Sequence, residues 1–187
     1  MLDSSGSIGD RNFQRMLNFV RTLIFRLNID GGTARVSIVT FGDKAQINFG
    51  LTRYRLSADA ANAIYDIRYE HGRTNTSGAL RLVRERVFTT DGGDRPDVPN
   101  ICMVITDGDS DNPDSTFSEA SALRDHNVTV LTLGVGDEEW LDLPELRGIA
   151  SEPRHRNVLN VRRFDQLDSV VKALQQATCN GQFHSAF

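Results

Sequence analysis

The sequence predicts an α/β fold in which a mostly parallel sheet is covered by helices on both faces. Segments with strand character alternate with amphipathic helical segments along the whole chain, and this alternation is typical of doubly wound sheets. Residues 101–106 are almost continuously apolar, as expected for a strand that is buried on both faces. No repeat, linker or low-complexity tract interrupts the pattern, so we expect one domain over residues 1–180 and a C-terminal tail over 181–187.

The first half of the chain supplies one long helix and two strands. A helix of about eighteen residues is expected soon after Asp3, because apolar residues recur there at helical spacing. These residues are Phe13, Met16, Leu17, Phe19, Val20, Leu23 and Leu27. Residues 35–41 are rich in β-branched residues and predict a strand, and residues 45–49 predict a short antiparallel edge strand beside it.

The second half continues the alternation. Helices are predicted over residues 58–68 and 77–88, and the Gly- and Asp-rich segment 91–97 is predicted to be a surface loop. After the strand 101–106, the predicted elements are a helix over 115–125, a strand over 128–133, a helix over 139–149, a strand over 158–161 and a helix over 165–177.

Size and charge limit the possible functions. The chain has 187 residues, of which 39% are hydrophobic, and this is enough for a real core. Its net charge of −4 gives no electrostatic reason to bind nucleic acid or an anionic membrane, and no apolar run is long enough for membrane insertion.

Only Met1 and Leu2 precede the first polar run, whereas a strand normally has about five residues. We therefore expect that the first strand is truncated and that a secretion signal and further domains lie upstream.

Three distant segments carry the oxygen ligands of a divalent cation. Asp3, Ser5 and Ser7 occupy alternate positions before the first helix, Thr74 lies in a polar loop, and Asp107 follows the strand 101–106. A helix cap would explain one residue of the first run but not three. A set with oxygen ligands and neither His nor Cys suits one Mg²⁺, Mn²⁺ or Ca²⁺ ion rather than zinc. Two carboxylates leave such a cation short of negative charge, so a carboxylate from another molecule would complete the site.

This ordered series resembles the von Willebrand factor A domain, which has a Rossmann-like fold. The resemblance is carried by Asp-x-Ser-x-Ser at residues 3–7, Gly-x-Thr-x-Thr at 72–76 and Thr-Asp-Gly at 106–108. In that family these motifs form the metal-ion-dependent adhesion site (MIDAS), and the resemblance implies that Thr74 rather than Thr76 is the ligand. Residues 145–153 look like those of the extracellular matrix branch, which includes matrilins, collagens VI and XII, and invertebrate matrix proteins.

The resemblance implies a secreted, non-catalytic adhesion domain of the extracellular matrix. Its partner would be a matrix protein, with collagen the first candidate, and a Glu or Asp of that partner would bind the cation. Arg73 and Asp109 are candidates for direct contact with the ligand. Arg73 stands where related domains commonly have a second glycine, and it could equally be a solvated charge.

Three alternatives remain open from the sequence. The chain could be a structural matrix module whose metal only stabilises the fold, or an intracellular A-type domain of a chaperone or ATPase assembly. It could also be a phosphatase of the haloacid dehalogenase type, with Asp107 as nucleophile and Asp109 as general acid. That family needs a lysine between this motif and its distal acids, and no lysine lies between Asp107 and Asp137.

The cysteines and the glycosylation sequons also lead to expectations. Cys102 lies in an apolar strand and is expected to be a buried thiol. In domains that this chain resembles, a cysteine at the position of Cys179 often pairs with one before the first strand, a partner absent here, and a bridge to Cys102 is the alternative. Asn75 and Asn127 begin N-x-Ser/Thr sequons. A sugar on Asn75 would crowd the metal, so Asn127 is the better candidate if the protein is secreted.

Overall fold

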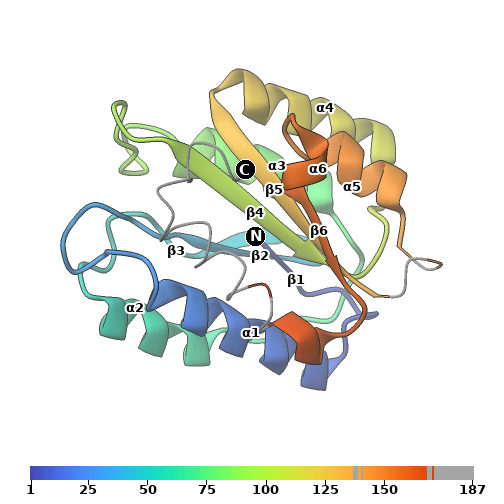
Figure 1. Ribbon diagram of the computed structural model, residues 1–187, viewed down its shortest axis with the longest axis horizontal. Helices are drawn as coiled ribbons and strands as arrows, with labels where there is room; N and C mark the ends of the chain where they lie inside the picture. The colour runs from blue at the N-terminus through green and yellow to red at the C-terminus, as the bar shows by residue number, and fades with distance from the viewer. Residues whose placement is uncertain (137–138, 140, 168–169, 171–187) are drawn as a thin grey trace.

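The protein is built on one six-stranded sheet. The computed structural model describes residues 1–136, 139, 141–167 and 170 (Figure 1). The strands lie in the order β3-β2-β1-β4-β5-β6, and every neighbouring pair is parallel except β2 and β3. Their bounds are β1 (Leu2–Asp3), β2 (Ile38–Phe41), β3 (Ala45–Phe49), β4 (Asn100–Thr106), β5 (Val128–Val135) and β6 (Val158–Val161). The predicted fold class, including the antiparallel edge strand, is confirmed.

Helices cover both faces of the sheet. α1 and α2 lie on one face, and α3, α4 and α5 lie on the other (Figure 1). The bounds of the helices and turns are α1 (Asp10–Ile24), α2 (Ser57–Ala63), η1 (Ile64–Asp66), α3 (Thr76–Leu82), η2 (Val83–Val87), α4 (Pro113–Asp125), α5 (Leu143–Ile149), α6 (Arg154–Asn157) and η3 (Phe164–Gln166). No helix among the residues placed in the structure has the length and apolar character needed to cross a lipid bilayer.

Each face of the sheet has its own hydrophobic core. Phe13 of α1 packs in the first core and Leu123 of α4 in the second, and both are fully buried. β4 serves both cores, because Ile105 faces the first and its neighbour Val104 faces the second. This two-sided burial explains why the sequence of β4 is almost continuously apolar.

Several element boundaries differ from the predicted ones. α1 ends at Ile24, and Leu27, which fits the helical spacing, is 39% exposed beyond its end. The helix predicted over 139–149 begins only at Leu143, because the side chain of Asp142 caps it and Pro144 occupies its first turn. The helix predicted over 77–88 continues after Leu82 as a π-helical turn.

The remaining differences lie in β2 and in the last part of the chain. Residues 35–37 were predicted to be strand, but the ladder with β3 starts at Ile38, where its register shifts. The short helix α6 was not predicted. Of the helix predicted over 165–177, the described residues are 165 and 166, which belong to the 3₁₀ turn η3, and Leu167 and Val170, which are helical. Cys102 is a buried free thiol, whereas Cys179 lies outside the described residues.

Shortening a leucine in the second core should destabilise the fold. Leu123→Ala is expected to lower the free energy of unfolding by about 3 kcal/mol, since it leaves a cavity under α4. The matched change Leu27→Ala, at an exposed leucine, should cost less than about 1 kcal/mol. Urea denaturation of both variants measures the difference. Equal losses in the two variants would contradict the placement of Leu123 in the core.

Candidate metal centre

The site forms where the strand order of the sheet reverses. β1 lies between β2 and β4 and is parallel to both, and Leu2 is paired with Ile105. Asp3 at the end of β1 and Asp107 after β4 therefore emerge at the same edge of the sheet. Ligand sites of open α/β sheets form at this kind of position, outside the carboxyl ends of the strands.

Hydrogen bonds connect the side chains of the first and third segments of the predicted metal site. The Oδ1 atom of Asp3 accepts the backbone N–H of Ser5 at 2.8 Å, and its Oδ2 atom accepts the hydroxyl of Thr106 at 2.6 Å. The hydroxyls of Ser5 and Ser7 lie 3.0 Å apart, and the hydroxyl of Ser7 donates to Asp107 Oδ1 at 2.9 Å. Four of the five predicted ligands thus form one connected group of oxygen atoms.

Backbone hydrogen bonds bring the Thr74 loop to this group. The N–H of Gly6 donates to Gly72 O at 2.9 Å. On the other side, the N–H of Asp111 donates to Thr74 O at 2.9 Å, and the N–H of Thr74 donates to Asp111 Oδ1 at 3.2 Å. The Thr74 hydroxyl has no hydrogen-bond partner among the described residues, whereas Thr76 is buried at the start of α3.

Asp43 supports the same loop, and the sequence analysis missed it. Its Oδ1 atom accepts the N–H of Arg73 at 2.9 Å, and its carbonyl accepts the Asn75 amide at 3.2 Å. The loop passes so close that a Cβ on Gly72 would lie 2.8 Å from Asp43 N, so this position requires glycine. The sequence did carry one signal for this role of Asp43. The residue follows Gly42, just after β2, which lies next to β1 and parallel to it.

The two predicted contact residues lie in different settings. Arg73 Nε is 3.4 Å from Asp111 Oδ1, and its side chain is 75% exposed beside the Thr74 loop. Asp109 is exposed, and its carboxylate lies within 4.8 Å of those of Asp142 and Glu145. Glu145 is buried and accepts the N–H of Ser110 at 3.1 Å, so it fixes the start of the loop after β4. The sequence analysis did not foresee this role of Glu145.

Within the described part of the chain, the two site carboxylates lack a compensating positive charge. Burial, together with the nearby charge of Asp3, raises the pKa of Asp107 from its ordinary 3.8 to about 6. Burial likewise raises the pKa of Asp3, which is fully enclosed. No basic side chain in the described part of the chain forms an ion pair with either residue. Paired acids beside three hydroxyls are a donor set that fits a hard divalent cation.

Comparison with known proteins agrees with this geometry. The chain is 33% identical over 184 residues to cuticlin-6 from Caenorhabditis elegans, covering 98% of this chain and 31% of cuticlin-6. It is 30% identical over 181 residues to mouse cochlin, covering 96% of this chain and 31% of cochlin. The chain therefore spans about a third of the length of these curated relatives.

A solved structure and a family model agree with these relatives. Proximal thread matrix protein 1 from the mussel byssus matches with a TM-score of 0.85 and 28% identity, covering 95% of this chain and 46% of that chain. One structure of that mussel protein has a zinc-occupied MIDAS motif. The model of the von Willebrand factor type A domain matches residues 1–173. Because this match covers nearly the whole sequence, the chain belongs to the von Willebrand factor type A domain family.

Proposed function

We propose that this chain is a non-catalytic adhesion domain that binds an extracellular matrix protein through a divalent cation. Asp3, Ser5, Ser7, Thr74 and Asp107 would hold the cation. The observation that carries the proposal is the pair of desolvated carboxylates, Asp3 and Asp107, which face hydroxyl groups rather than a basic side chain. A buried acid without a neighbouring positive charge destabilises a fold, and a bound cation would remove that penalty.

The cation would provide the link to the partner. When bound, it supplies a concentrated positive charge that attracts a carboxylate of another protein. The all-oxygen donor set favours Mg²⁺, Mn²⁺ or Ca²⁺, and the zinc in the mussel relative shows that a related site accepts a divalent ion. Because only two protein carboxylates would surround the ion, it would still attract a Glu or Asp side chain of another protein.

A matrix protein is the partner class that the relatives favour. Cochlin and chains of collagens VI and XX are among them, and at the family level they support an extracellular location over an intracellular chaperone or ATPase assembly. Collagen is the specific partner that we propose. Arg73 is 75% exposed beside Thr74, and this exposure supports the proposal that its guanidinium contacts a bound ligand.

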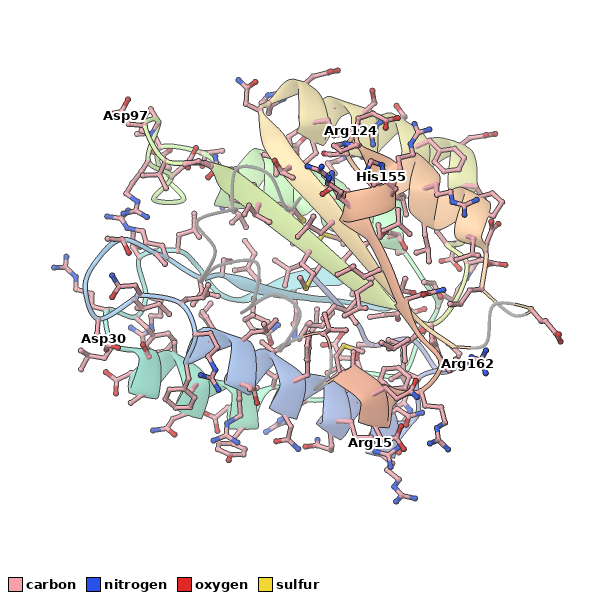
Figure 2. All side chains as sticks on the ribbon, viewed as in Figure 1. Arg15, Asp30, Asp97, Arg124, His155 and Arg162 are labelled. Atoms are coloured by element: carbon pink, nitrogen blue, oxygen red, sulfur yellow. The ribbon has the colours of Figure 1, made fainter. Side chains whose placement is uncertain are left out.

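Removing one site carboxylate should abolish metal-dependent binding. Asp107→Asn is expected to weaken Mn²⁺ binding by about 100-fold or more, because loss of even an outer support of a metal site costs 10–100-fold. The matched control is Asp97→Asn, in the exposed loop before β4 (Figure 2), at the far end of that strand. Calorimetric titration with Mn²⁺ measures the affinity of each variant.

The same variants test adhesion. Immobilised collagens and other matrix proteins should capture the wild-type chain and Asp97→Asn in Mg²⁺ or Mn²⁺, but not in EDTA, and they should not capture Asp107→Asn. Capture that persists in EDTA would contradict the metal mechanism. A chain that binds Mn²⁺ but captures no matrix protein would favour the structural module, in which the metal only stabilises the fold.

Metal binding should depend on pH through Asp107. The pKa of this residue in the folded protein is about 6, above its ordinary 3.8, so the metal-free folded state binds more protons than the unfolded state between these values. Metal-free stability should therefore fall as pH rises through this window. Mn²⁺ requires the deprotonated carboxylate, so its affinity should fall by up to about tenfold per pH unit below 6.

Thermal unfolding with and without Mn²⁺ checks this pH dependence. The gain in Tm from Mn²⁺ should be largest above pH 6 and should shrink towards pH 4.5, and Asp107→Asn should show little gain at either pH. A gain in Tm that is the same at pH 5 and pH 7.5 would be incompatible with proton release from Asp107.

A further inference from the structure

A single hydroxyl group joins both ends of the loop that carries Ser5 and Ser7. The Tyr69 hydroxyl donates to Ser5 O at 2.6 Å and accepts the backbone N–H of Gly9 at 2.9 Å. Ser5 lies two residues after the end of β1, and Gly9 is the N-cap residue of α1. Tyr69 itself belongs to the segment before the Thr74 loop, so its hydroxyl connects two of the three segments of the metal centre.

The ring of Tyr69 is held firmly enough to position its hydroxyl. One face stacks on Phe13 with a centroid separation of 5.0 Å, and Phe13 is fully buried in the first core. The ring of His71 lies 4.0 Å away. The N–H of Glu70 also donates to the hydroxyl of Ser4 at 2.9 Å. The tyrosine is therefore anchored to the core on one side and to the metal-binding loop on the other.

Apart from Tyr69, the loop is held by the hydrogen bond from Gly6 N–H to Gly72 O and by the buried side chain of Ile8, whereas the Tyr69 hydroxyl bonds to both of its ends. Gly9 is the N-cap residue of α1, has a φ of 72°, and offers no side-chain cap to the helix. Ser7 is exposed, and the described hydrogen bonds of its hydroxyl go only to the other site residues, Ser5 and Asp107. Fixing these hydroxyls before the cation arrives reduces the entropy lost on binding.

We propose that Tyr69 is a positioning residue of the metal centre. It does not contact the cation; its hydroxyl holds the Ser5–Gly9 loop in the conformation that presents Ser5 and Ser7. The inference rests on the proposed metal site. The known motifs of the site do not include this residue, because it acts on backbone groups rather than on the ion.

Removing only the hydroxyl tests this role. Tyr69→Phe keeps the ring and its stacking on Phe13 but loses both hydrogen bonds to the loop. The matched control is Tyr54→Phe, whose ring packs on Phe49 at a centroid separation of 5.0 Å in another part of the core. Titration calorimetry measures the Mn²⁺ affinity of each variant, and urea denaturation in EDTA measures its metal-free stability.

Tyr69→Phe is expected to weaken Mn²⁺ binding by about tenfold or more, whereas Tyr54→Phe should match the wild type. A purely structural role would lower metal-free stability and leave the affinity unchanged, and that result would overturn the proposal. If the wild type itself binds no Mn²⁺, the proposed metal site fails first and the role of Tyr69 fails with it. The two failures are therefore distinguishable.

A second observation concerns the two glycosylation sequons. The side chain of Asn75 is fully engaged: its Oδ1 accepts Gly78 N at 2.9 Å as the cap of α3, and its Nδ2 donates to Asp43 O at 3.2 Å. Asn127 is exposed in the turn between α4 and β5, with a φ of 59°. Its side-chain amide has no hydrogen-bond partner among the described residues. The turn precedes β5, at the opposite end of the strands from Asp107.

We infer that Asn127 carries an N-linked glycan and that Asn75 does not. The inference rests on the proposed extracellular location. The donor would be a polyprenyl-diphosphate-linked oligosaccharide. A bond forms between Asn127 Nδ2 and C1 of the sugar, the C1–O bond breaks, the diphosphate leaves with its electron pair, and the amide loses a proton. A glycan on Asn75 would replace the cap of α3, whereas one on Asn127 leaves the metal face open.

Secretion of the full chain from insect cells tests this assignment. The intact mass of the wild type should fall by one glycan after treatment with peptide-N-glycosidase F. Thr129→Ala, which removes the Asn127 sequon, should abolish this loss of mass. Ser77→Ala removes the other sequon but keeps the Asn75 side chain, and it should leave the loss unchanged. A wild type without a glycan, or a glycan that persists in Thr129→Ala, would overturn the inference.

Discussion

The parallel pairing of β1 with β4 is the constraint on which the candidate site depends. It places two carboxylates, Asp3 and Asp107, at the same edge of the sheet, where neither meets a basic side chain among the described residues. Folding thus brings like charges together in a poorly solvated place, as the raised pKa of Asp107 shows. The hydroxyls of Thr106 and Ser7 stabilise the two charges only in part. In the proposed function, a bound cation would supply the positive charge that these carboxylates lack.

At the edge of the sheet where the site lies, hydrogen bonds to backbone groups hold three loops against one another. Gly6 bonds to Gly72, Thr74 exchanges hydrogen bonds with Asp111, and Asp43 accepts from Arg73. These contacts do not depend on the ion. The backbone of Thr74 is consequently held at this edge of the sheet in the metal-free protein, where its hydroxyl would be available as a ligand.

The sequence was sufficient to predict the fold class and to predict that the candidate ligand residues converge. Strand character before Asp3 and Asp107 predicts that each follows the carboxyl end of a strand, and the pairing of β1 with β4 in the structure brings the two to one edge. Whether Asp3, Ser5, Ser7, Thr74 and Asp107 bind a cation stays a prediction.

Tyr69, Asp43 and Glu145 could not be found in the same way, because they act on backbone N–H and C=O groups and have no fixed spacing from the ligands. The start of α5 was predicted too early for a different reason. Its signal, Asp142 followed by Pro144, is present in the sequence, but the residues before it were predicted to be helical as well.

The wide separation of Asp3 and Asp107 along the chain has a consequence for folding. About a hundred residues must be ordered before the two side chains meet, and such non-local contacts form late. The unfolded chain offers no comparable set of ligands, so an ion at the proposed site would bind only the native state and would stabilise it by mass action. The stoichiometry of cation binding at the proposed site would therefore measure what fraction of a preparation has its sheet correctly assembled.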